Sequence, residues 1–143
     1  MKTLKLSFLT LCLMLGYNLT YAEQPISKPE KFTSNYTLKA YVDAIFYGKV
    51  KGVAQIIDDD AKFTIQRGET IIIQNKAQIL QAMKRLENVQ QDCEITQSIV
   101  QMLPNQIIAK IDMKYQAFTR SNFVTLSESG AGWKVSRVAS TFK

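Results

Sequence analysis

The sequence predicts an α+β fold, in which three helices pack on a strongly curved, mostly antiparallel sheet. Apolar residues recur at helical spacing three times in the first part of the chain, and after residue 92 they recur at every second position. Helical and extended patterns are therefore segregated along the chain. We expect a helical layer on one face of one sheet, in the element order ααββαββββ.

The 143-residue chain begins with a segment typical of an export signal. Lysines precede an apolar run over residues 6–15, and Thr20 and Ala22 are small residues at the spacing that a signal peptidase reads. This predicts a signal peptide over residues 1–22, cleaved after Ala22. The protein would then be secreted or periplasmic, with no stable membrane insertion after cleavage. The alternative is an uncleaved anchor, although the run is too short to span a bilayer comfortably.

Residues 23–33 contain two of the three prolines and several charges, so we expect an exposed lead-in before a domain over residues 34–143. Ser34 or Asn35 is a suitable N-cap for the first helix, and Gly48 ends it. The expected buried stripe of this helix consists of Leu38, Tyr41, Val42, Ile45 and Phe46.

A second, short helix is expected over residues 50–57, followed by three consecutive aspartates, Asp58–Asp60. In an extended chain only alternate side chains converge, and two carboxylates fall short of the roughly six to eight oxygens that calcium takes. We therefore interpret the triplet as structural and expect no metal site. Strict alternation predicts a strand over residues 61–66, and a β-branched run predicts another over residues 69–74.

Asn75 is a good N-cap, and Gln78 three residues later completes a capping box for a third helix. Beyond it the apolar period is two. Strands are expected over residues 93–99, 107–116, 122–128 and 133–142, with the last two joined as a hairpin.

The composition excludes several kinds of site. The absence of histidine removes Ser-His-Asp and Cys-His nucleophile pairs and every histidine-based zinc site. After signal cleavage Cys93 is the only cysteine, so we expect it to be buried, with pairing between chains as the alternative. Without Lys2 and Lys5, 16 Lys and Arg remain against 12 Asp and Glu, a net charge of +4. No basic run interleaved with aromatics occurs, so we expect neither a nucleic-acid partner nor a cofactor.

Three stretches resemble a known superfamily. They are "YVDAIFYGKVKGVAQIIDDDAKF", "NKAQILQAM" and "SNFVTLSESGAGWKVSRVASTF", over residues 41–63, 75–83 and 121–142. In order they resemble the two opening helices with their acidic entry into the first strand, the helix that closes the cone, and the terminal hairpin of the nuclear transport factor 2-like (cystatin-like or ketosteroid-isomerase-like) superfamily. The Gly-x-Trp-Lys-Val pattern is most similar to its secreted bacterial lumazine-binding branch. This fold hosts isomerases, hydrolases, ligand carriers and dimerisation modules, so the resemblance implies the fold more than the function.

The resemblance also locates where an isomerase would keep its base. Ketosteroid-isomerase members hold a carboxylate on the first strand facing an oxyanion hole. That register falls near Ile65, which is not an acid, and the alternation places Asp112 on the outer face. We therefore name no catalytic residue, and the sequence leans against an enzyme.

The cone interior could still bind a ligand. The candidates are Tyr41, Tyr47, Gln97, Tyr115, Trp133 and Arg137. Arg137 is expected on the same strand face as Trp133 and Val135, where a guanidinium beside an aromatic would suit an anionic or flat ligand. The alternative is that the aromatics are core packing and that Arg137 is a surface residue.

The outer face of the sheet is a second candidate surface. The apolar residues out of phase with the inward set are Val100, Met102, Ile108, Phe118 and Phe123. Relatives of this fold commonly dimerise through the sheet, so a homodimer is expected. Three functions stay open: a non-enzymatic, dimeric domain that binds a small organic ligand, a metal-free isomerase- or hydrolase-like enzyme, and an interaction module with a filled cavity.

Overall fold

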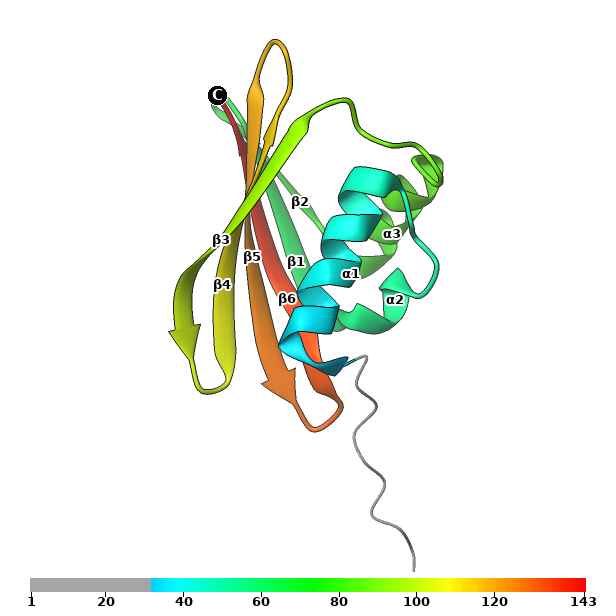
Figure 1. Cartoon of the computed structure of the whole chain (residues 1–143), viewed down its shortest axis with the longest axis vertical. Coiled ribbons are helices and arrows are strands. Elements are labelled where there is room, and N and C mark those ends of the chain that lie inside the picture. Colours follow the sequence, from blue (N-terminus) through cyan, green and yellow to red (C-terminus); the bar gives the residue numbers. More distant parts are fainter. Residues whose placement is uncertain (1–31) are drawn as a thin grey trace, which may run out of the picture.

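The computed structural model describes residues 32–143. The predicted signal peptide and residues 23–31 of the lead-in lie outside the described residues. In chain order the elements are α1 (Ser34–Tyr47), α2 (Val53–Ile56), β1 (Ile57–Arg67), β2 (Thr70–Gln74), α3 (Lys76–Arg85), β3 (Glu94–Leu103), β4 (Gln106–Lys114), β5 (Thr119–Ser129) and β6 (Gly132–Phe142) (Figure 1). The predicted order ααββαββββ is confirmed.

The six strands form one curved sheet in the order β2-β1-β6-β5-β4-β3. Among the strands of residues 32–143, only β1 and β6 pair in parallel, and the other neighbouring pairs are antiparallel. All three helices lie on one side of the sheet, which we call the inner face (Figure 1). The α+β cone expected from the sequence is therefore confirmed.

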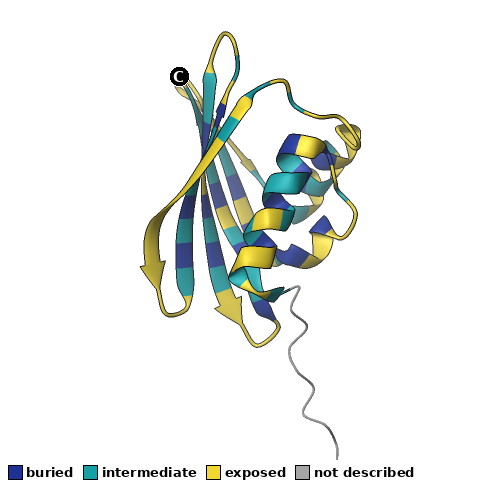
Figure 2. Ribbon diagram, viewed as in Figure 1, coloured by how far each residue is buried: buried dark blue, intermediate teal, exposed yellow. Residues whose placement is uncertain are grey.

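The core lies between the helices and the inner face, where Figure 2 shows buried bands across the strands. The alternation of β4 places Ile107, Ala109, Ile111 and Met113 inside, and all four are buried. The helices contribute Tyr41 and Ala44 from α1 and Met83 from α3, among others. Burial of this apolar surface against one continuous sheet is the main stabilising contribution to such a domain.

A capping threonine and a glycine define the two ends of α1. The N-cap is Thr33 and not Ser34 or Asn35 as expected, and its hydroxyl accepts a hydrogen bond from the Tyr36 amide at 3.2 Å. Gly48 ends the helix with φ +68°, as expected, and a Cβ there would meet the backbone of Leu86 and lie 2.8 Å from the Asn88 amide nitrogen. A glycine is required here by both conformation and space.

The helix expected over residues 50–57 is shorter in the structure, because α2 ends at Ile56 and Ile57 takes an extended conformation paired with Val135 of β6. The aspartate triplet therefore lies inside β1. Asp58 Oδ1 accepts a hydrogen bond from the Asp60 amide at 3.0 Å, and Asp59 pairs with Lys76 at 2.7 Å. The triplet thus ties the start of β1 to the start of α3.

Candidate functional site

The sheet register brings two arginines and a phenylalanine together at one end of the inner face. Arg120 of β5 is the direct partner of Phe142 of β6, and Arg67 is the next residue after Gln66, which pairs with Thr141. The guanidinium carbons of Arg67 and Arg120 lie 5.1 and 5.9 Å from the centre of the Phe142 ring. One aromatic ring is therefore flanked by two cations.

Arg120 is held by a buried polar pair deeper in the cone. Its Nε donates to Asn122 Oδ1 at 3.0 Å and its Nη2 donates to Ser140 Oγ at 3.4 Å. The Ser140 hydroxyl itself donates to Asn122 Oδ1 at 2.6 Å. Asn122 and Ser140 are 0 and 3 % exposed, so this network fixes the guanidinium from below while Arg120 remains half-buried.

Neither arginine has a counter-charge within the part of the chain that the structure describes. The ion pairs of residues 32–143 are Lys39–Asp43, Lys49–Asp43, Lys76–Asp59 and Lys110–Asp112. Arg67 and Arg120 take part in none of them. A half-buried guanidinium supported only by neutral dipoles is a ready partner for an external anion.

An aromatic wall borders the two arginines. The rings of Tyr115 and Phe118 stack at 4.6 Å, and the Phe118 ring lies 5.9 Å from that of Phe142. The Tyr115 hydroxyl donates to Gln91 Oε1 at 3.0 Å, and burial raises its pKa. We call Arg67, Tyr115, Phe118, Arg120 and Phe142 together the cone-mouth cluster.

Two of the predicted candidates, Tyr41 and Tyr115, lie at or below this cluster. Tyr41 is 1 % exposed, and burial raises its pKa to about 12, although the nearby charge of Arg120 acts in the opposite direction. Its hydroxyl is therefore protonated at neutral pH and cannot act as a base. Cys93, expected to be buried, is a half-buried free thiol beside Tyr115, and burial raises its pKa.

Tyr47 and Gln97 come together at a second place, in a groove between α1 and the inner face of β3. The groove has a volume of about 580 Å³ and is also lined by Leu38, Val42 and Asp43. Both candidate side chains are exposed, and the Lys49 ammonium lies 4.6 Å from the centre of the Tyr47 ring. We call this the α1–β3 groove.

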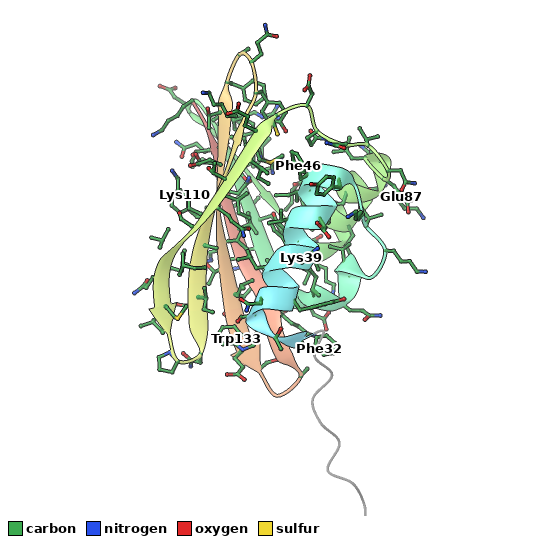
Figure 3. All side chains as sticks on the ribbon, viewed as in Figure 1. Phe32, Lys39, Phe46, Glu87, Lys110 and Trp133 are labelled. Atoms are coloured by element: carbon green, nitrogen blue, oxygen red, sulfur yellow. The ribbon has the colours of Figure 1, made fainter. Side chains whose placement is uncertain are left out.

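Trp133 and Arg137 do not share a face, contrary to the expectation from alternation. Thr125 pairs with Arg137 while Leu126 pairs with Val135, so Ser136 is an extra residue that makes a bulge in β6. Trp133 packs against the core near the start of α1, at the end of that helix away from Phe46 (Figure 3). Arg137 is exposed on the outer face. The expected shared face of these two residues is wrong because the bulge reverses the alternation, and Arg137 is a surface residue, as the alternative interpretation had it.

The outer face of the sheet holds a groove of about 680 Å³. Its lining residues are Val100, Gln106, Ile108, Phe123, Thr125, Ser136, Arg137 and Ala139. Of the apolar residues expected there, Val100, Ile108 and Phe123 are present. Met102 is not, because a register shift between Ile99 and Gln101 puts it in phase with inward-facing Ile107. Phe118 stacks on Tyr115 instead.

The described residues, 32–143, contain no group of three or more side chains placed to hold a metal ion. Within the same range no helix is long and apolar enough to cross a membrane.

Sequence reasoning missed most of the cone-mouth cluster. The signal was present in the alternation of β5: Arg120, Asn122, Val124 and Leu126 share one phase, and the last three are buried. The strand was expected to begin at Asn122, whereas it begins at Thr119. Extending the alternation back by one period would have placed Arg120 inside.

The helical layer on a curved six-stranded sheet is the fold of nuclear transport factor 2-like (NTF2-like) proteins, and solved structures agree. An NTF2-like protein of unknown function from Silicibacter pomeroyi matches with a TM-score of 0.61 at 9% identity, over 76% of this chain and 92% of that chain. Another from Shewanella baltica matches with a TM-score of 0.58 at 13% identity, over 75% and 88% of the two chains.

A ketosteroid isomerase-like protein from Erwinia carotovora atroseptica matches with a TM-score of 0.53 at 17% identity, over 80% of this chain and 97% of that chain. No family model matches the sequence, and no curated protein does. At these identities the likeness shows the fold alone.

Proposed function

We propose that this chain is an exported, non-enzymatic NTF2-like domain that binds a small organic ligand on the inner side of its cone and forms a homodimer through the outer face of its sheet. One observation carries the binding part: the inner face presents Arg120, fixed by Asn122 and Ser140, without a carboxylate partner in residues 32–143. Preorganised polar groups beside an apolar wall are what a small-molecule site requires.

The same interior favours binding over proton transfer. A general base must be a carboxylate or similar group within reach of a bound substrate. No Asp or Glu among the described residues is buried, and position 65, where the isomerase register would place the base, is Ile65. Asp112 lies on the outer face, where its hydrogen bonds with Lys110 and Ser121 lower its pKa.

Two places on the inner side suit a ligand. The α1–β3 groove, at about 580 Å³, falls within the usual size range of small-molecule pockets. The cone-mouth cluster offers charge and aromatic surface. The similarity of the terminal hairpin to the lumazine-binding branch agrees with a flat ring ligand, and it names a branch of the superfamily rather than a ligand.

The outer groove supports the dimer. Val100 and Phe123 are exposed apolar side chains on adjoining parts of this face. The ion pair between Lys110 and Asp112, at 2.8 Å, lies on the same face, which Figure 3 shows with Lys110 directed away from the helices. Apolar patches rimmed by charge are typical of surfaces that pair with another chain.

Native mass spectrometry of the mature protein, purified from its own host, tests the proposal. We expect the mass of a dimer, an N-terminus at Glu23 and a retained small molecule that is released on denaturation. Refolded protein is the control, because it should lose the retained mass and keep the dimer. A ligand-free monomer would contradict both the binding and the dimerisation.

A further inference from the structure

We propose that the cone-mouth cluster binds a small organic anion, whose carboxylate is held by Arg120 and Arg67 and whose flat ring lies against Phe118. This inference rests on the proposed function, because it names the chemical class of ligand that the inner side of the cone takes.

Arg120 has the geometry of a carboxylate receptor. Two of its N–H groups are engaged, with Asn122 at 3.0 Å and Ser140 at 3.4 Å, and these contacts orient the guanidinium. The other donors of the planar fork remain for a ligand, and a fork of this kind matches a carboxylate in a bidentate manner. Asn122 and Ser140 are buried, so the receptor is supported from within the fold.

The charge distribution favours an anion over a neutral ligand. Arg67 of β1 and Arg120 of β5 approach the same Phe142 ring from the strands on either side of β6, so both guanidinium groups add positive charge at this end of the inner face. No carboxylate of residues 32–143 pairs with either guanidinium. Partial burial of a cation without a counter-ion is unfavourable, and an anion bound at the half-buried Arg120 offsets this desolvation.

The surroundings select a flat apolar body for that anion. Phe118 is 41 % exposed although it stacks on Tyr115, so part of its aromatic surface is available beside the arginines. Ile72 is 43 % exposed in the strand that follows Arg67. A ring against Phe118 gains offset-stacking contacts while its carboxylate reaches Arg120.

The test uses benzoate and benzamide, which share a ring and differ in charge. Titrations of ¹⁵N-labelled protein are followed by the backbone amide and arginine Nε–H resonances. We expect benzoate to shift the Nε–H signal of Arg120 saturably, and benzamide to bind more weakly by about tenfold or more. Arg120→Gln should weaken benzoate binding by about tenfold or more, and Arg67→Gln should weaken it severalfold. Arg137→Gln, which removes an arginine of the outer face, is the matched control and should leave benzoate binding unchanged.

Two results would overturn the inference: equal affinity for benzoate and benzamide, or undiminished benzoate binding in the folded Arg67→Gln and Arg120→Gln proteins. If Arg120→Gln fails to fold, Arg67→Gln decides, because Arg67 is exposed and donates no hydrogen bond to the network. The inference alone would be contradicted if the retained native ligand is neutral, or if benzoate shifts only resonances of the α1–β3 groove. Either result would leave the proposed function intact. The absence of any retained or added ligand would contradict both.

Discussion

Each face of the β5–β6 hairpin carries an arginine beside a hydrogen-bonded pair of polar side chains, but the two faces differ in burial. On the inner face Arg120 lies above a hydrogen-bonded pair, Asn122 and Ser140, which is fully buried. On the outer face Arg137 lies beside another cross-strand pair, the hydroxyls of Ser127 and Ser136 at 2.8 Å, and is itself exposed. Arg120 is therefore held in place by buried partners and Arg137 is solvated, because within residues 32–143 the helices cover the inner face alone.

The largest expected difference between the faces is in stability. Asn122→Ala removes the acceptor of both Arg120 Nε and Ser140 Oγ and leaves buried donors unsatisfied, so we expect a loss of about 2–4 kcal/mol in the free energy of unfolding. Ser127→Ala breaks the matched pair on the outer face, where water can replace the lost partner, and should cost about 1 kcal/mol or less. Urea unfolding of both variants measures the two losses. Similar losses would mean that the inner network is no more protected from water than the outer pair.

The sequence predicted the inner face of β4 correctly and the inner face of β6 only in part, for a physical reason. Ile107 to Met113 alternate without interruption, so the period alone gives their orientation. In β6 the bulge at Ser136 inserts one residue, and every later side chain changes face relative to Trp133. A bulge depends on how two strands pair, so the alternation of apolar residues along one strand does not show where it lies. Arg137 was accordingly expected on the face of Trp133, whereas Arg120 was missed for another reason, because β5 begins at Thr119 and not at Asn122.

The start of β1 shows the same limit at a helix end. Residues 50–57 have helical spacing, but Ile57 gains a ladder partner, Val135, by leaving the helix. Tertiary pairing therefore shortened α2 to four residues. The capping box of α3 needed no such partner, because Asn75 and Gln78 satisfy each other's backbone amides at 3.0 Å, and it was predicted correctly.

The next expected effect is a response of the covered, inner side to alkaline pH. Burial raises the pKa of Tyr41 from 10.0 to about 12, so the folded state holds this proton more tightly than the unfolded chain does. Its contribution to stability is then fully present below pH 10 and is lost as the pH rises through about 12, a loss of about 2–3 kcal/mol. The Tyr41→Phe protein should lack this component when unfolding is measured between pH 9 and pH 12. Tyr36→Phe, at an exposed position of α1, is the control and should follow the wild-type profile. An unchanged profile in Tyr41→Phe would mean that this hydroxyl is solvated in solution.

The smallest effect on stability is expected on the outer face, where the consequence should be in assembly. Phe123→Asp replaces an exposed side chain of the outer groove, so the free energy of unfolding of the monomer should change by about 0.5 kcal/mol or less. A carboxylate at the centre of a paired apolar surface would be desolvated without a partner, and we expect dimer dissociation to increase by at least about tenfold. Sedimentation velocity measures the association, and Arg120→Gln is the inner-face counterpart that should remain dimeric. If the Arg120→Gln protein dissociates and the Phe123→Asp protein remains dimeric, the contact between protomers lies on the inner side. The outer face would then not be the dimer surface.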